Sequence, residues 1–209
     1  MKKIFCMLSL AVALQGCSKP EDQATQTETT SAPSNQLVKT TDTPTPPAPE
    51  PSPMEELVQK QTLAEAVDYL KPQMTDTFNS FPEAAGYLAL WWHKNGSKWN
   101  DLKDFEDAKF GKVLKDPDTE RGKRICTFGS IIEIAADKSA GFTVYHAGIM
   151  DRNYKNMRVL AVGSTGEIIA QSTAKFCGIV IGKVGFENAA GGTTEAVYAV
   201  GLFDLPENR

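Results

Sequence analysis

The chain has 209 residues, with 22 Lys plus Arg, 26 Asp plus Glu and a formal net charge of −4 at pH 7. About 155 residues follow Pro53, enough for one domain with a hydrophobic core of its own. General nucleic-acid binding depends on basic groups that neutralise phosphates, so the acidic balance predicts no nucleic acid partner. Beyond the N-terminal region, no stretch of the sequence is long and apolar enough for a transmembrane helix.

The first seventeen residues have the pattern of an export signal. Two lysines after Met1 form a basic start, residues 4–14 are almost wholly apolar, and the run Leu14-Gln15-Gly16-Cys17 follows. This run resembles the signal of bacterial lipoproteins. The resemblance implies that residues 1–16 are removed and that Cys17 becomes a lipid-bearing amino terminus that attaches the protein to a membrane.

Two other interpretations of this region differ in what happens to the apolar segment. An uncleaved anchor is excluded, because about 11 apolar residues fall short of the roughly 20 that cross a bilayer as a helix. A plain secretory signal cut after Ala11-Val12-Ala13 stays open, and in that case Cys17 has no role. Ser18 is not acidic, and by the same lipoprotein resemblance this predicts the outer membrane of the cell envelope, facing the periplasm.

Residues 17–53 predict a disordered tether between the lipid and the folded part. Eight of the chain's twelve prolines lie here, and Leu37 and Val38 are the only sizeable aliphatic residues. Such a composition buries too little apolar area to offset the entropy of ordering the chain. Its proline-rich end, residues 44–53, favours polyproline II and therefore a semi-rigid spacer.

Cys126 and Cys177 are the cysteines of the folded part if Cys6 leaves with the signal and Cys17 carries lipid. In an oxidising envelope an even pair indicates one disulfide, and two free thiols are the alternative. Neither cysteine has a second Cys or His at ligand spacing, so no metal site is predicted.

Residues 54–115 predict a helical segment. Leu57, Ala64, Val67 and Leu70 recur at helical spacing, which predicts one helix that starts near Met54 and stops before Pro72. Further helices are predicted over residues 82–93, 102–109 and 110–114.

Residues 116–209 change to alternating segments bounded by Gly, Asn or Asp. Five strands are predicted, over 124–136, 142–149, 157–162, 176–184 and 196–203. On the first strand, Cys126, Phe128, Ile132 and Ile134 are predicted to share one face, with Ile131 on the other.

Five strands of which the first is long and bent at Gly129 resemble an OB-fold, over roughly residues 120–205. The resemblance implies an α+β protein in which N-terminal helices pack on a five-stranded, OB-fold-like antiparallel β-barrel, the barrel occupying residues 116–209. In that fold the first strand pairs with the fourth, which places Cys126 beside Cys177. An immunoglobulin-like sandwich is the rival, but it normally needs about seven strands.

Catalytic groups are scarce in the sequence. The histidines are His93 and His146, and neither lies in a recognisable catalytic motif. The acidic run of residues 116–122 lacks the glycine and glutamate spacing of a calcium loop. We therefore expect no catalytic residues, no metal and no cofactor.

The second hairpin offers the candidate binding surface. OB-folds commonly bind oligomeric ligands across strands two and three, so the resemblance places ligand-binding residues on these strands and at the tip between them. The candidates are Tyr145, Arg152, Asn153, Tyr154 and Arg158. An ordinary hydrated hairpin is the alternative interpretation.

These patterns together predict an envelope lipoprotein that acts as a non-catalytic binding module. Its expected partners are the membrane, through lipid on Cys17, and an envelope protein or glycan. An inhibitor or immunity-type lipoprotein that blocks an exported enzyme is one alternative, and a hydrolase with an unrecognised site is another.

Overall fold

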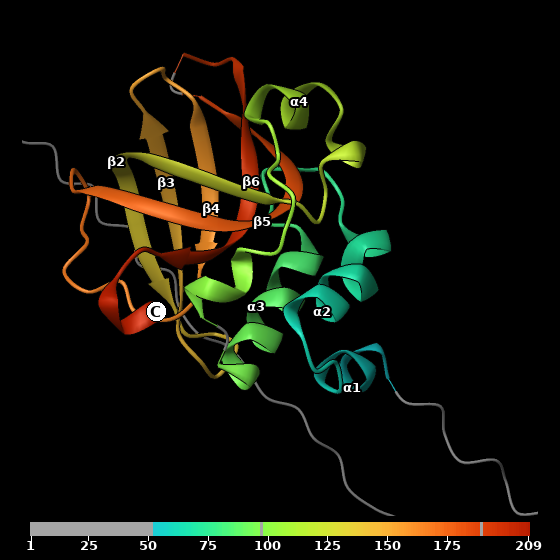
Figure 1. Cartoon of the computed structure of the whole chain (residues 1–209). Helices are drawn as coiled ribbons and strands as arrows, with labels where there is room; N and C mark the ends of the chain where they lie inside the picture. The colour runs from blue at the N-terminus through green and yellow to red at the C-terminus, as the bar shows by residue number, and fades with distance from the viewer. Residues whose placement is uncertain (1–51, 97, 189) are drawn as a thin grey trace, which may run out of the picture. The chain divides into compact units, whose positions relative to one another are not determined.

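The computed structural model describes residues 52–96, 98–188 and 190–209 (Figure 1). The predicted signal peptide of residues 1–16, the lipid-bearing Cys17 and nearly all of the tether of residues 17–53 lie outside the described residues. Those three assignments stay predictions.

Within the described residues, four α-helices precede the long strands. They are α1 (Pro53–Val58), α2 (Leu63–Leu70), α3 (Glu83–Asn95) and α4 (Phe110–Lys115). Short 3-10 helices lie at Lys71–Gln73, Trp99–Leu102, Pro117–Thr119 and Pro206–Asn208. Figure 1 shows α1, α2 and α3 gathered beside the strands, with α4 apart from them. No helix of the described residues is both long enough and apolar enough to cross a bilayer.

The first predicted helix is in fact two helices, α1 and α2, so the expectation of one continuous helix was wrong. Thr62 lies between them with extended backbone angles and accepts a hydrogen bond from the Glu65 backbone N–H at 3.2 Å. The Glu65 carboxylate in turn accepts from the Thr62 N–H at 3.1 Å. This reciprocal cap starts a new helix at Leu63, because a capping residue cannot itself be helical.

The later helices agree with the sequence only in part. α3 begins beside Pro82 as predicted and ends at Gly96, which adopts the left-handed conformation that favours glycine (φ 62°). α4 confirms the helix predicted for residues 110–114. The helix predicted for residues 102–109 was wrong, since only the 3-10 turn Trp99–Leu102 reaches into that range.

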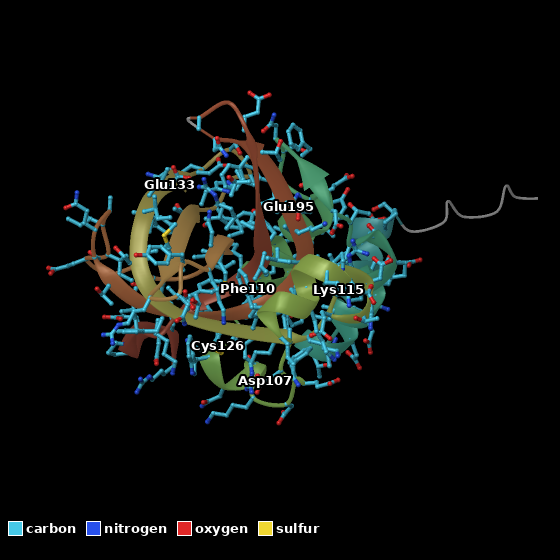
Figure 2. All side chains as sticks on the ribbon, turned by 90° about the horizontal axis from the view of Figure 1, so that it is seen from above. Asp107, Phe110, Lys115, Cys126, Glu133 and Glu195 are labelled. Carbon is cyan, nitrogen blue, oxygen red and sulfur yellow. A yellow bond between two sulfur atoms is a disulfide. The ribbon has the colours of Figure 1, made fainter. Side chains whose placement is uncertain are left out.

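Six strands form the sheet in the part of the chain that the structure describes. They are β1 (Thr77–Phe78), β2 (Arg124–Asp137), β3 (Val144–Asp151), β4 (Asn156–Ala161), β5 (Thr173–Glu187) and β6 (Thr193–Phe203). The five predicted strands are confirmed, and the two-residue β1 is additional. β5 pairs with both β2 and β6, so the order β2-β3-β4-β6-β5 closes into a ring. Figure 2 shows β2 curving between Cys126 and Glu133.

Strand directions differ from the antiparallel expectation. β4 pairs with β6 in parallel, and β1 pairs with β5 in parallel, while the other ladders are antiparallel. The long β5 separates β4 from β6 in sequence and returns the chain to the end from which β4 started, so β6 runs in the direction of β4. The protein is therefore α+β, with a six-stranded mixed sheet.

Both faces of the sheet contribute to cores. Along β6, Val197 and Ala199 belong to one buried cluster, whereas Tyr198 and Val200 belong to another. The second cluster also contains the buried apolar residues of α1, α2 and α3, including Trp91. A strand buried on both faces reads as a continuous apolar run, which is the pattern of β6.

The predicted grouping of residues on the faces of β2 was wrong at Ile134, which packs with buried Ile131 and not with exposed Phe128 and Ile132. Ile125 and Ile131 are buried, whereas Phe128 and Ile132 are 54% and 45% exposed. β2 carries apolar residues at both odd and even positions, so alternation by itself does not show which face lies inward. A register shift between Ile131 and Glu133 further changes the pairing with β3.

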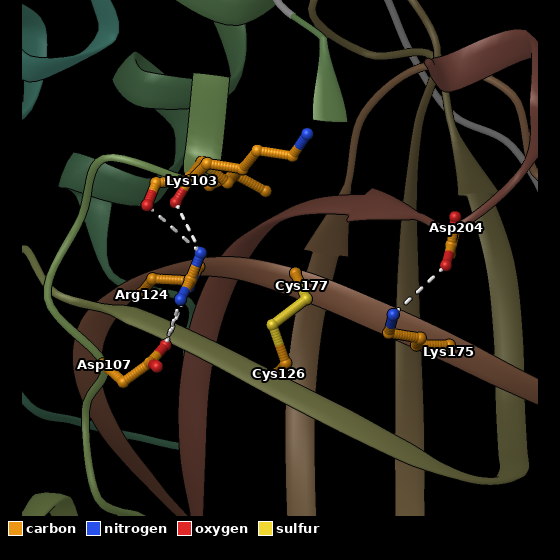
Figure 3. The surroundings of a disulfide bond; sticks show 8 residues. Lys103, Asp107, Arg124, Cys126, Lys175, Cys177 and Asp204 are labelled. Atoms are coloured by element: carbon orange, nitrogen blue, oxygen red, sulfur yellow. Dashed lines mark hydrogen bonds and ion pairs between the residues drawn. A yellow bond between two sulfur atoms is a disulfide. The ribbon is translucent and has the colours of Figure 1, made fainter. Parts of the chain in front are cut away.

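The predicted disulfide is present. Cys126 and Cys177 lie directly opposite each other on β2 and β5, and the structure joins them (Figure 3). On one side of the bond Arg124 pairs with Asp107 at 2.7 Å, and on the other Lys175 lies 3.3 Å from Asp204.

Candidate ligand-binding site

The candidate site begins as a row of residues across three strands. In the strand register, Glu133 of β2 lies opposite Gly148 of β3, and Gly148 lies opposite Arg158 of β4. Residues opposite one another in a sheet present their side chains to the same face. Glu133 and Arg158 therefore flank a glycine on one face of the sheet.

Gly148 lets these two charged side chains meet. A Cβ atom at this position would lie 3.1 Å from the Arg158 Nη1 atom and 3.5 Å from the Glu133 Cγ atom. The Arg158 guanidinium thus crosses the bare backbone of β3 and forms an ion pair with Glu133. A Cβ atom at position 148 would press on the guanidinium, which would have to shift by a few tenths of an ångström.

Phe186 covers the same guanidinium from β5. Its ring centroid lies 4.6 Å from the Arg158 Cζ atom, which is the distance of a cation–π contact. The Arg158 side chain is only 24% exposed, whereas that of Glu133 is 61% exposed. Burial lowers the pKa of Arg158 from its ordinary value, but a guanidinium stays charged at neutral pH.

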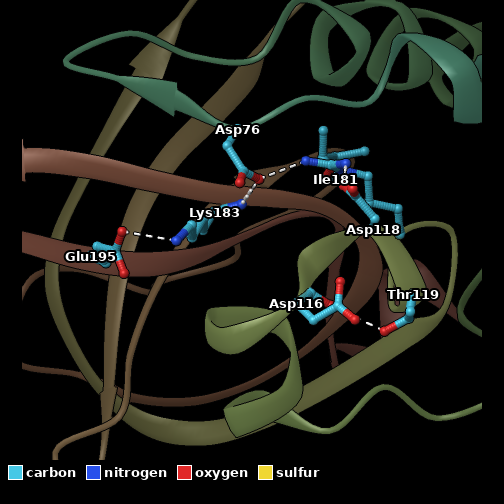
Figure 4. A network of polar contacts seen from close by, with 8 residues as sticks. Asp76, Asp116, Asp118, Thr119, Ile181, Lys183 and Glu195 are labelled. Atoms are coloured by element: carbon cyan, nitrogen blue, oxygen red, sulfur yellow. Dashed lines mark hydrogen bonds and ion pairs between the residues drawn. The ribbon is translucent and has the colours of Figure 1, made fainter.

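Phe81 also lines the site, and it lies in a segment that is held to the sheet. The Asn79 backbone N–H donates to the Gly185 carbonyl at 2.8 Å, next to the short parallel ladder of β1 and β5. Before β1, the Asp76 carboxylate accepts from the Lys183 backbone N–H at 3.0 Å and pairs with Arg121 at 2.8 Å (Figure 4). These contacts fix the chain that carries Phe81.

His146 of β3 lies under Phe81. The two rings stack with centroids 4.1 Å apart, and Phe81 remains 57% exposed. His146 Nε2 lies 3.4 Å from the Asp137 carboxylate, while its Nδ1 atom is buried without a partner among the described residues. The pKa of Asp137 is lowered, mainly by the hydrogen bond from the Ser139 backbone N–H.

These side chains enclose a hollow of about 300 Å³. Its polar and aromatic lining comes from Asn79, Ser80, Phe81, Glu133, His146, Arg158 and Phe186. A second hollow of about 450 Å³ lies beside it, between α3 and β3, and has walls that include Phe142 and Leu160. Both hollows share Phe81 and His146, so the stacked pair separates them.

The structure separates most of the residues predicted to bind ligand. Arg158 lines the hollow. Tyr145 alternates with His146 along β3 and packs instead against the core cluster that contains Val197 and Ala199. Arg152, Asn153 and Tyr154 occupy the tip of the β3–β4 hairpin, where Tyr154 is 84% exposed. The five residues therefore do not form one surface.

Several residues of the hollow were not predicted from the sequence. Phe81 and Glu133 lie outside the second hairpin in sequence, and Phe186 lies beyond residue 184, where the fourth predicted strand ends. One sequence signal points to the site: a glycine in the middle of an otherwise well-formed strand, Gly148, marks a close approach of other groups.

The two histidines have structural contacts in the described residues. His93 stacks on Phe142 with centroids 4.6 Å apart, and His146 stacks on Phe81. Among residues 52–96, 98–188 and 190–209, no group of three or more His, Cys, Asp or Glu is arranged to hold a metal ion.

No family model matches the sequence, and no curated protein matches it. A solved structure similar to this chain is the mitochondrial single-stranded DNA-binding protein from S. cerevisiae, which is 10% identical. The similarity covers 42% of this chain and 97% of that chain, with a TM-score of 0.29. A likeness at this score assigns no ligand to the present chain.

The prediction that nucleic acid is excluded as a partner was wrong as it was argued from composition. The physical fault lies in the use of net charge. A charge of −4 is a sum over the whole chain, whereas a ligand meets only a local surface, and that surface can carry cations such as Arg158.

Proposed function

We propose that the protein is a non-catalytic binding module of the cell envelope and that it binds a glycan in the hollow around Arg158. The observation that carries this proposal is the position of Arg158, held under Phe186 and beside the half-exposed ring of Phe81 in a concave site. A fixed planar cation next to an exposed aromatic face is suited to a ligand with both polar edges and apolar faces.

A sugar ring has this combination of surfaces. Its C–H faces pack on aromatic rings, and its hydroxyl groups both donate and accept hydrogen bonds. In the hollow, Phe81 offers the ring, Arg158 offers donors and Glu133 offers an acceptor. The volume of about 300 Å³ is in the range of sites for small ligands.

The topology supports the location of this site. We propose that the ring of β2 to β6 is an OB-fold-like barrel against which the N-terminal helices pack. Its strand order, with a parallel pair between the third and fifth of these strands, supports that assignment. β3 and β4 are then strands two and three, the face on which OB-folds commonly bind oligonucleotides and oligosaccharides.

The membrane attachment is part of the same proposal. Export, removal of residues 1–16, a lipid on Cys17 and an outer-membrane location facing the periplasm are supported by the sequence pattern. Mass spectrometry of the native protein should find a mature chain that begins with an acylated Cys17. A Cys17→Ser variant should lose the lipid and leave the membrane fraction.

Ligand binding is tested by calorimetric titration of the full-length protein, purified in detergent. The probes are chitobiose, which is neutral, and the disaccharide of N-acetylglucosamine and N-acetylmuramic acid, which carries a carboxylate. At least one should bind, and Arg158→Gln and Phe81→Ala should each weaken that binding at least tenfold. Tyr154→Ala, at the exposed hairpin tip, is the control and should bind as the unchanged protein does.

The proposal is wrong if neither disaccharide binds. It is also wrong if Arg158→Gln and Phe81→Ala bind as well as Tyr154→Ala does. A urea unfolding midpoint within the error of the unchanged protein shows that each variant is folded.

A further inference from the structure

We infer that Glu133 occupies the place of an acidic group of the ligand, so that the glycan bound at this site carries a carboxylate that replaces Glu133 on Arg158. This inference rests on the proposed function and specifies the chemical class of the ligand.

The first argument is the unequal exposure of the ion pair. The Arg158 side chain is 24% exposed and that of Glu133 is 61% exposed. A guanidinium that has lost much of its water needs an anionic partner, because an unpaired charge is costly in a partly buried site. Among the described residues, Glu133 supplies the carboxylate for Arg158, and it does so from the solvent side.

The second argument is that Arg158 is positioned without help from Glu133. Phe186 covers the guanidinium at 4.6 Å, and the absent side chain of Gly148 leaves the path beneath it open. The cation is therefore held by packing, whereas Glu133 is held mainly by the ion pair itself. A change of partner would move Glu133 and leave Arg158 in place.

The third argument concerns the strand that carries Glu133. The ladder between β2 and β5 ends at Ser130, so Glu133 pairs only with β3 through Gly148. On its other edge this part of β2 has no strand partner among the described residues. The Glu133 side chain can thus turn outward into solvent without breaking another described contact.

Exchange of one carboxylate for another keeps the guanidinium paired, so little desolvation free energy is lost when the ligand enters. A planar Arg and a carboxylate also match in geometry and form two parallel hydrogen bonds. A neutral sugar lacks this exchange and has to bind beside the intact Arg158–Glu133 pair. The site should therefore prefer an acidic sugar over a neutral one of the same shape.

The two disaccharide probes test this preference, because they differ by the lactyl ether of the muramic acid unit, and this group carries the carboxylate. In calorimetric titrations of the full-length protein at low salt, we expect the acidic disaccharide to bind about tenfold more tightly, equivalent to about 1.4 kcal/mol. Glu133→Gln removes the competing charge and should tighten binding of the acidic disaccharide by about fivefold. The same change should leave binding of chitobiose within about twofold.

Glu195→Gln is a matched control. Glu195 is 48% exposed, pairs with Lys183 at 2.9 Å and does not line the hollow. This substitution changes the net charge by the same amount as Glu133→Gln, so any general attraction of the acidic probe appears in both variants. Only Glu133→Gln should show the additional fivefold gain, and Arg158→Gln should abolish the preference for the acidic disaccharide.

The outcomes separate this inference from the proposed function. If both disaccharides bind equally and Glu133→Gln weakens both, the inference is overturned, while the glycan-binding function stands with Glu133 as an acceptor for hydroxyls. If neither disaccharide binds, the proposed function fails and the inference with it. Binding of hexaglutamate or a single-stranded oligonucleotide alone would assign the site to an acidic peptide or a nucleic acid and would overturn both.

Discussion

Reduction of the Cys126–Cys177 disulfide should lower the free energy of unfolding without abolishing the fold. The bond joins two residues that face each other across the ladder of β2 and β5. That ladder pairs seven residues of β2, from Arg124 to Ser130, with β5, and its backbone hydrogen bonds do not depend on the sulfur atoms. The native sheet should therefore persist when the bond is reduced.

The magnitude follows from the length of the loop that the bond closes. The two cysteines are 51 residues apart in sequence. A cross-link of this length removes chain entropy from the unfolded state and stabilises the folded protein by about 4 kcal/mol at 25 °C. Whole domains are stable by roughly 5–15 kcal/mol, so this one bond supplies a large share of the total.

Urea unfolding followed by tryptophan fluorescence measures the effect, because Trp91 and Trp92 are each only 1% exposed in the native protein. The unfolding free energy should fall by about 3–4 kcal/mol on addition of reductant. A double variant, Cys126→Ala with Cys177→Ala, is the control and should not respond to reductant. A fall of less than about 1 kcal/mol, or an equal response of the double variant, would refute the loop-closure account.

Three further changes test individual features of the fold. Tyr198→Phe should raise the unfolding free energy by about 1 kcal/mol in urea, because the Tyr198 hydroxyl is buried without a partner among the described residues, and burial raises its pKa. Thr62→Ala should lower it by about 1 kcal/mol through loss of the α2 cap, measured the same way; an unchanged midpoint would contradict the capping account. The pKa of buried Glu120 is lowered, chiefly by the hydrogen bond from the Lys109 backbone N–H, so its contribution to stability is present above the ordinary glutamate pKa of 4.5 and is lost as the pH falls below it. Thermal unfolding from pH 7 to 3 should show a shallower acid loss for Glu120→Gln, and an unchanged slope would contradict this role.

Part of the site was open to prediction from sequence, and part was not. Arg158 was predicted as a binding residue because it is basic and lies on the third predicted strand, in the second hairpin. The structure places it in the hollow. Its partners Glu133 and Phe186 come from strands that meet β4 only through the ring of pairings, and Phe81 comes from the segment before α3. Such proximity depends on strand order, which local periodicity does not encode.

The sequence also did not show which face of each strand packs against which part of the core. Tyr145 and His146 are neighbours in sequence, yet Tyr145 packs against the core cluster that contains Val113 of α4, whereas His146 lines the hollow. Where both faces of a strand are apolar, alternation leaves two equal choices, and the packing of the helices on one face selects between them.

The five long strands and the breaks between them could be predicted from the sequence alone, because turn residues and alternation are local properties, and the cysteine pair followed from the number of cysteines. The parallel pairing of β4 with β6, the inward face of β2 and the meeting of Arg158 with Glu133 across Gly148 became visible only in the folded chain. Those features depend on contacts between residues far apart in sequence, and such contacts form only when the ring of strands closes.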